Sequence, residues 1–129
     1  MRNIQTVQKS LVFIDTRVAN YQSLIAGLPA DSEVILIDGG NGLQQMADAL
    51  AGRSGVEAIH IFSHGSAGAV QLGDTLLSSA NLNAYASQLA SIGQSLTAEG
   101  DLLLYGCNVG ASAAGQSFVE SIARITQAD

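Results

Sequence analysis

The chain has 129 residues, enough for one domain with a single hydrophobic core. Hydrophobic residues make up 47% and charged residues 12%, which excludes a disordered chain, while the apolar runs are too short to span a membrane. The net charge is −6, and the five lysine and arginine residues are scattered, so neither nucleic acid nor an anionic membrane is an expected partner. The N-terminal stretch MRNIQTVQKS lacks the apolar segment of a signal peptide, so none is expected.

Strand-like and helix-like segments alternate in the first half of the chain. LVFID (11–15) is an apolar run that predicts a strand, and VANYQSLIAGL (18–28) has apolar residues at helical spacing. EVILID (33–38) predicts a second strand, and LQQMADAL (43–50) places its apolar residues on one helical face. Two strand–helix units therefore open the chain.

The second half continues the alternation with one insertion. VEAIHIFS (56–63) predicts a third strand, and AVQLGDTLL (69–77) predicts a small hairpin that turns at Gly73-Asp74. An apolar stripe over 82–92 predicts a helix, which leads to a fourth strand, DLLLY (101–105). A last helix carries Phe118, Val119, Ile122 and Ile125.

This pattern predicts the fold class. Strands that are apolar on both faces, each followed by a helix, are typical of a parallel sheet covered on both sides. We expect one α/β domain over residues 1–129, a three-layer α/β/α sandwich with a mostly parallel sheet of about four main strands and a small β-hairpin. Right-handed crossovers place the carboxyl ends of all four strands at one edge, where ligands of such sheets bind.

Two stretches that end at this edge carry chemistry. IHIFSHGSAGAV leaves the third strand through His64 and Gly65, and DLLLYGCNVG leaves the fourth through Gly106 and Cys107, the only cysteine. If these strands are neighbours, His64 contacts Cys107. A histidine and a helix N-terminus both favour a thiolate, the form that attacks a carbonyl. Backbone amides at Gly65 and at Gly106-Cys107 are candidate donors to the resulting oxyanion.

Other polar residues near the edge allow two interpretations. Asp15 and Asp38 end the first and second strands, so either carboxylate is a candidate for substrate binding or for orienting His64. The alternative is that these carboxylates cap turns or face water. His60 lies in mid-strand, where we expect a buried histidine with one hydrogen-bond partner.

No cofactor or metal is expected. The chain lacks the nucleophile elbow of serine hydrolases, the dinucleotide fingerprint and the P-loop lysine. His60 and His64 lie on a predicted strand with one cysteine elsewhere, which is a poor zinc ligand set. A lone cysteine is also compatible with an inert buried thiol, or with a redox sensor that needs an external partner.

An apolar block that ends in His-Gly, followed by one that ends in Cys, resembles the caspase-like cysteine peptidases, which include caspases, legumains, gingipains, separases and bacterial CHAT domains. More closely, IHIFSHGSAGAVQLGDTLL and GDLLLYGCNVGASAAGQSFVESIA resemble the DUF4347 domain of very large bacterial surface and repeat-containing proteins. The resemblance implies a sheet of strand order 2-1-3-4, with His64 as the catalytic histidine and Cys107 as the nucleophile. It also implies a further strand after Asp129 and an extracellular or cell-surface location in a bacterium.

Two functions are therefore expected from different classes. The first is a caspase-like cysteine peptidase that acts on a peptide or protein, including its own parent chain. The second is a catalytically inert interaction or targeting module of an adhesin-like protein. The separation of His64 from Cys107, and a groove beside them, distinguishes the two, whereas the oligomeric state stays open.

Overall fold

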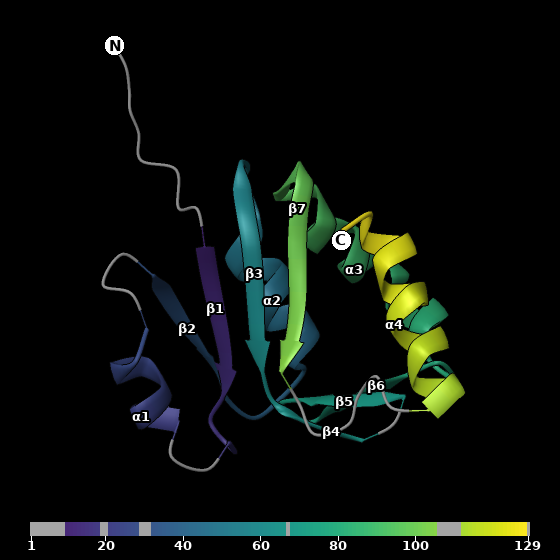
Figure 1. Ribbon diagram of the computed structural model, residues 1–129, viewed down its shortest axis with the longest axis horizontal. Coiled ribbons are helices and arrows are strands. Elements are labelled where there is room, and N and C mark those ends of the chain that lie inside the picture. Colours follow the sequence, from purple (N-terminus) through teal and green to yellow (C-terminus); the bar gives the residue numbers. More distant parts are fainter. Residues whose placement is uncertain (1–9, 19–20, 29–31, 67, 106–111, 129) are drawn as a thin grey trace.

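A computed structural model describes residues 10–18, 21–28, 32–66, 68–105 and 112–128. Four parallel strands form the main sheet, in the order β2-β1-β3-β7 (Figure 1). These strands are β1 (Ser10–Asp15), β2 (Glu33–Ile37), β3 (Val56–Phe62) and β7 (Leu96–Tyr105). The predicted α/β class and strand order are confirmed, with β7 as the fourth main strand.

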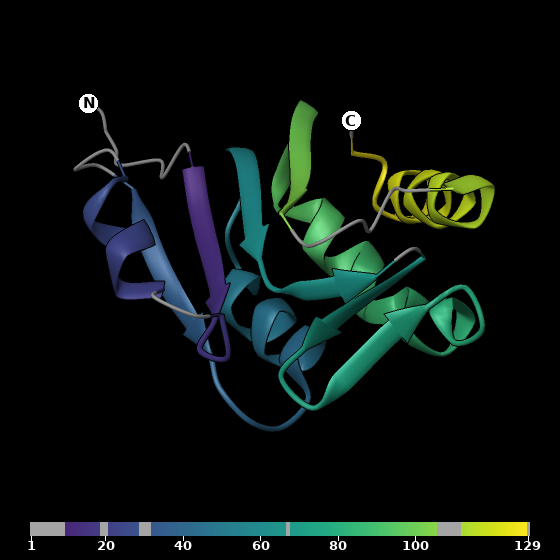
Figure 2. The same cartoon turned by 60° about the horizontal axis from the view of Figure 1, so that its bottom comes forward.

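A small antiparallel sheet lies across the carboxyl ends of the main strands (Figures 1 and 2). Its strands are β4 (His64–Ser66), β5 (Ala69–Leu72) and β6 (Thr75–Ser78). The predicted hairpin is thus confirmed, and Gly73 and Asp74 join its strands. The sequence did not predict β4, which pairs with β5 and begins at His64, opposite Gln71.

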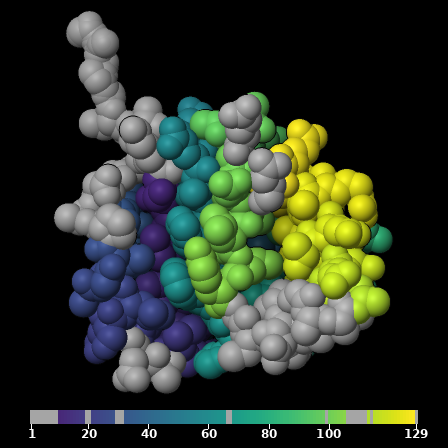
Figure 3. Space-filling view, in the orientation of Figure 1, coloured from purple at the N-terminus to yellow at the C-terminus, as the bar shows by residue number. Residues whose placement is uncertain are grey.

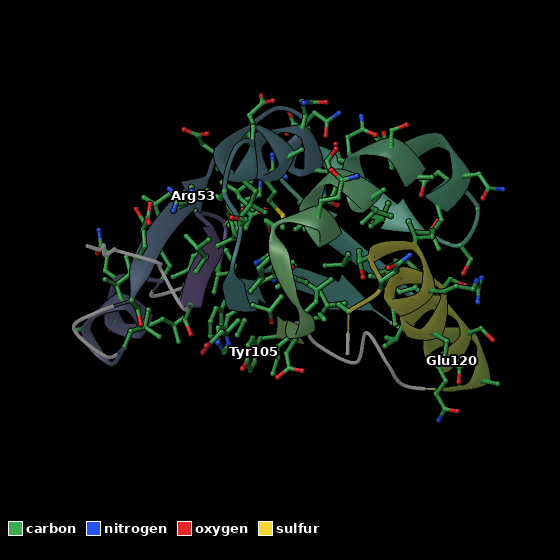
Figure 4. All side chains as sticks on the ribbon, turned by 90° about the horizontal axis from the view of Figure 1, so that it is seen from above. Arg53, Tyr105 and Glu120 are labelled. Carbon is green, nitrogen blue, oxygen red and sulfur yellow. The ribbon has the colours of Figure 1, made fainter. Side chains whose placement is uncertain are left out.

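The helices surround the main sheet unevenly. They are α1 (Tyr21–Ala26), α2 (Gly42–Leu50), the 3-10 helix η1 (Leu82–Tyr85), α3 (Ala86–Gln94) and α4 (Ser112–Thr126). α2 and α3 lie together behind the sheet in Figure 1. α1 lies on the β2 side (Figure 4). α4 lies on the β7 side, where it packs against α3 and adds Phe118 and Ile122 to the same core.

The hydrophobic core fills the space between the sheet and α2 and α3. Successive side chains of a strand point to opposite faces, so alternate residues of each strand enter this core. From the strands these are Leu11, Phe13, Ile37, Ile59 and Ile61, which pack against Leu43 and Met46 of α2 and Leu89 and Ile92 of α3. Burying each such side chain contributes about 1.5–3 kcal/mol, which fixes the register that aligns the strand ends.

The opposite face of the sheet is only partly covered. Val12 and Ile14 of β1 are buried there, but Leu36 of β2 is 42% exposed and Tyr105 of β7 is 41% exposed. Atoms of β3 and β7 lie at the molecular surface between the α1 side and α4 (Figure 3). The second helical layer thus leaves an apolar, half-exposed strip over β3 and β7.

The turn before α2 ties the sheet edge to the small sheet. Asn41 caps the helix, because its side-chain oxygen accepts the Gln44 amide hydrogen at 3.0 Å. Such a cap contributes about 1 kcal/mol. A Cβ on Gly42 would overlap Leu72, so only glycine lets the start of α2 touch the end of β5 this closely.

Candidate active site

The pairing of β3 with β7 sets the geometry of the candidate site. Phe62 lies in register with Tyr105, and the Ser63 amide donates to the Tyr105 carbonyl oxygen at 3.2 Å. The expectation that these strands are neighbours is therefore confirmed. His64 follows Phe62 by two positions, and Cys107 follows Tyr105 by two. Gly106 and Cys107 themselves lie outside the described residues.

His64 is exposed at the start of β4, and its imidazole has a defined partner. Nε2 lies 2.8 Å from the backbone carbonyl oxygen of Arg17, in the loop after β1. Because a carbonyl oxygen only accepts hydrogen bonds, Nε2 carries the hydrogen and donates it. In the neutral ring, Nδ1 is then the basic nitrogen, able to take a proton from a neighbouring group.

Gly65 lies in β4 opposite Val70 of β5. Its place directly after His64 keeps its amide near the carboxyl edge of the main sheet. The backbone support expected from Gly65 and Gly106 stays a prediction, since Gly106 lies outside the described part of the chain.

Asp15 ends β1 as expected, but its carboxylate is only 1% exposed. One oxygen accepts the Arg17 amide hydrogen and the other accepts the Gly73 amide hydrogen, each at 2.8 Å. Both oxygens are thus engaged by the protein's own backbone. The structure therefore favours a turn-capping carboxylate over one that binds substrate directly, and an orienting effect of Asp15 on His64 stays a prediction.

Arg17 extends this connection to the hairpin turn. Its guanidinium donates to the Gly73 carbonyl oxygen and forms an ion pair with Asp74. Asp74 also accepts the Gly40 amide hydrogen at 2.8 Å. The hydrogen bond from Arg17, and then that from Gly40, hold the pKa of Asp74 below its usual range. We call Asp15, Arg17, Gly73 and Asp74 the hairpin clasp.

Sequence reasoning recognised the turn at Gly73-Asp74 but missed the clasp. Arg17 and Asp74 are 57 positions apart, so no local spacing signals their contact. The available signal was chemical: an arginine lies two residues after a strand-end aspartate in a chain with only five basic residues.

Asp38 lies at the carboxyl end of β2 and is exposed. Its backbone amide donates to Oε1 of Gln45 at 3.3 Å, and its carbonyl oxygen accepts from Nε2 of the same side chain at 3.1 Å. These bonds fix the backbone of Asp38 and do not involve its carboxylate. Asp38 stays a candidate substrate-binding residue.

Three rings gather on the half-exposed strip beside the candidate site. Phe62 and Tyr105 stack with ring centroids 4.4 Å apart, and His60 stacks on Tyr105 at 5.7 Å. Nδ1 of His60 lies 3.0 Å from the Tyr105 hydroxyl. The mid-strand histidine has one hydrogen-bond partner, as expected, although it is half-buried rather than buried.

Two described cavities lie away from this edge. One, of about 480 Å³, is lined by the end of α3, the start of β7 and the end of α4. Another, of about 280 Å³, lies between α2 and α3. His64 lines neither. Within the described residues, no three histidine, cysteine or acidic side chains gather as a metal site, and no helix is long and apolar enough to cross a membrane.

One buried hydroxyl next to His64 is unsatisfied. The Ser63 Oγ is buried and has no hydrogen-bond partner in the part of the chain that the structure describes. A buried hydroxyl without a partner costs free energy, so such groups are rare in native cores.

The fold and the described part of the site define an α/β domain in which His64 lies just beyond the carboxyl edge of a parallel sheet. The chain belongs to the family described as Domain of unknown function (DUF4347), whose model matches residues 11–129. No curated protein and no solved structure matches the chain. The expected membership in DUF4347 is confirmed, whereas the caspase-like resemblance stays a prediction that must be argued from the site.

Proposed function

We propose that this domain is a caspase-like cysteine peptidase in which Cys107 is the nucleophile and His64 is the general base. The observation that carries the proposal is the parallel register of β3 with β7, in which Phe62 pairs with Tyr105. His64 follows Phe62 by two positions and Cys107 follows Tyr105 by two. Because adjacent strands lie about 4.8 Å apart, this equal spacing favours contact between the His64 and Cys107 side chains.

The hydrogen bond of His64 suits this role. With Nε2 donating to the Arg17 carbonyl oxygen, Nδ1 is free to take the thiol proton of Cys107. The thiolate then attacks the peptide carbonyl carbon, and the C–N bond breaks as Nδ1 returns the proton to the leaving amine. A thioester remains on Cys107, and water hydrolyses it to release the acid and restore the thiol.

Peptide or protein is the proposed substrate, with the parent chain as one source. An extracellular or cell-surface location in a bacterium belongs to the same proposal, because the family resemblance implies it. The net charge of −6 disfavours acidic segments near the site and favours a neutral or basic one. The exposed residue Asp38 lies at the same edge, and its carboxylate would contribute to that preference.

The test is covalent labelling by a peptidyl acyloxymethyl ketone, an electrophile that reacts with activated thiols. We expect labelling of the intact chain at neutral pH, none in Cys107→Ala, and a rate at least about 100-fold lower in His64→Ala, the usual scale of a positioned base. His60→Ala is the matched control and should label at the wild-type rate, because His60 contacts Tyr105 on the sheet face.

Labelling no faster than that of free cysteine, with no effect of His64→Ala, would contradict the proposal. The second candidate function, an inert interaction or targeting module, would then account for the domain. The observation that favours it is the half-exposed strip over β3 and β7, where Tyr105 is 41% exposed. Apolar strips of this kind commonly serve as contact surfaces.

A further inference from the structure

We propose that Asp15 and the Arg17–Asp74 pair are positioning residues for His64, an inference that rests on the proposed function for its catalytic meaning. The imidazole of His64 has one described protein partner, the Arg17 carbonyl oxygen. Arg17 lies in a loop, where backbone direction is set by hydrogen bonds rather than by a strand ladder. The groups that hold this loop therefore decide where the imidazole points.

The carboxylate of Asp15 holds the loop from the inside. It accepts the amide hydrogen of Arg17, the same residue whose carbonyl oxygen meets His64. Its second oxygen accepts the amide hydrogen of Gly73 in the hairpin turn. One buried side chain thus fixes the Arg17 backbone relative to the small sheet.

The side chain of Arg17 closes the connection from the outside. It donates to the Gly73 carbonyl oxygen and pairs with Asp74, which also accepts the Gly40 amide hydrogen. Gly73 is therefore held at its amide by Asp15 and at its carbonyl by Arg17. Its φ of +61° and the closeness of the Asp38 and Gly40 carbonyls leave no room for a side chain.

The backbone of His64 is also held by the same hairpin. His64 pairs with Gln71 of β5, and the Gln71 side chain donates to the Gly73 carbonyl oxygen at 2.8 Å. Both the main chain and the imidazole of His64 are thus set relative to Gly73. Loss of the clasp would release the carbonyl that orients the ring while the β4–β5 pairing still held the backbone.

Asparagine cannot replace Asp15 in this arrangement. An ionised carboxylate offers two acceptor oxygens, whereas an amide offers one oxygen and one NH₂ group. In Asp15→Asn one of the two backbone amides, of Arg17 or of Gly73, would face a donor and lose its partner. A buried unpaired amide is costly, so the loop would move.

The test is the tautomer ratio of the His64 imidazole, read from its ¹⁵N shifts and ring-proton couplings in the intact protein. We expect the Nε2–H form to dominate in the wild type. In Asp15→Asn and Arg17→Ala the ratio should move to that of the same histidine in the urea-unfolded chain. Arg53→Ala removes the other described arginine–carboxylate pair, with Glu33, and should leave the wild-type ratio unchanged.

A wild-type ratio in folded Asp15→Asn and folded Arg17→Ala would overturn the inference. If Asp15→Asn fails to fold, Arg17→Ala and Asp74→Asn decide the matter, because that pair is exposed. Arg17→Lys keeps the positive charge and should restore part of the wild-type ratio.

The labelling experiment separates this inference from the proposed function. A tautomer shift in the clasp variants, in a protein that no electrophile labels, supports positioning and refutes the peptidase. Labelling of the wild type with an unchanged ratio in the variants does the reverse. If both hold, the clasp variants should label about 10-fold or more slowly, the usual scale for loss of orientation around a catalytic group.

Discussion

At the residue scale, His64 and His60 show how partners define a side chain. His60 lies within β3 and His64 lies two residues after its end. His64 is hydrogen-bonded to the Arg17 carbonyl oxygen, whereas His60 is hydrogen-bonded to the Tyr105 hydroxyl. The first arrangement leaves a basic nitrogen at the carboxyl edge of the sheet, whereas the second occupies Nδ1 within a ring cluster. Only the first suits proton transfer, which is why His60→Ala is a fair control for His64→Ala.

A residue-scale prediction concerns the Glu33–Arg53 pair, which joins the start of β2 to the loop after α2. Both carboxylate oxygens of Glu33 accept from the guanidinium, at 2.8 and 2.7 Å. This hydrogen bonding holds the pKa of Glu33 below its usual range, although burial acts in the opposite direction. The pair's contribution is therefore complete above the usual pKa of about 4.3 and is lost as the pH falls through the lower folded-state pKa.

We expect Glu33→Gln to lower the free energy of unfolding by about 0.5–1 kcal/mol at neutral pH. The difference from the wild type should shrink below about pH 4, where the unfolded state takes up the proton first, and be lost as the pH falls through the lower folded-state pKa of Glu33. Urea midpoints over the acid range measure this effect. Glu57→Gln makes the same charge change at an exposed residue without an ion pair among the described residues, so an equal loss in both variants at every pH contradicts the account.

At the element scale, the edge strand β2 has different environments on its two sides, whereas β1 is buried on both. In β2, Ile37 is fully buried on the α2–α3 side, while Leu36 is 42% exposed on the opposite side. The apolar run EVILID predicted a strand. It could not predict that only one face of the strand is buried, because both faces carry apolar residues. β7 departs from the prediction in its length. It begins at Leu96 rather than at Asp101, since a bulge lets Leu96 pair with Val56.

A pair of truncations in β2 tests this difference between faces. We expect Ile37→Ala to lower the free energy of unfolding by about 2–5 kcal/mol, because it leaves a cavity in the core. Leu36→Ala should cost less than about 1 kcal/mol, because the Leu36 side chain is partly exposed and its truncation removes little buried apolar surface. Urea unfolding of both variants under the same conditions measures the two values. Equal losses would show that the second face is covered in solution.

At the scale of the whole molecule, the alternating strand and helix pattern predicted the α/β class and the family resemblance implied the strand order, but neither predicted the contacts between loops. Alternating strand and helix patterns, with crossovers of one hand, leave few arrangements for four strands. The hairpin clasp escaped prediction because it depends on contacts between Arg17, Gly73 and Asp74, far apart in the chain and free of any repeating pattern. Similarly, nothing in the sequence around His64 predicts its hydrogen bond to the Arg17 carbonyl oxygen.

The central claim is that the imidazole of His64 and the thiol of Cys107 lie side by side at the carboxyl edge of the sheet. A crystal structure of the intact chain measures it directly, as the separation of the Cys107 Sγ from the His64 Nδ1. The account predicts a separation of about 4 Å or less, within the reach of a loosened hydrogen bond. A separation of more than about 7 Å would contradict it, because the side chains at the ends of two adjacent strands would then not be in contact. A sulfur turned into the core among α2 and α3 would contradict it as well.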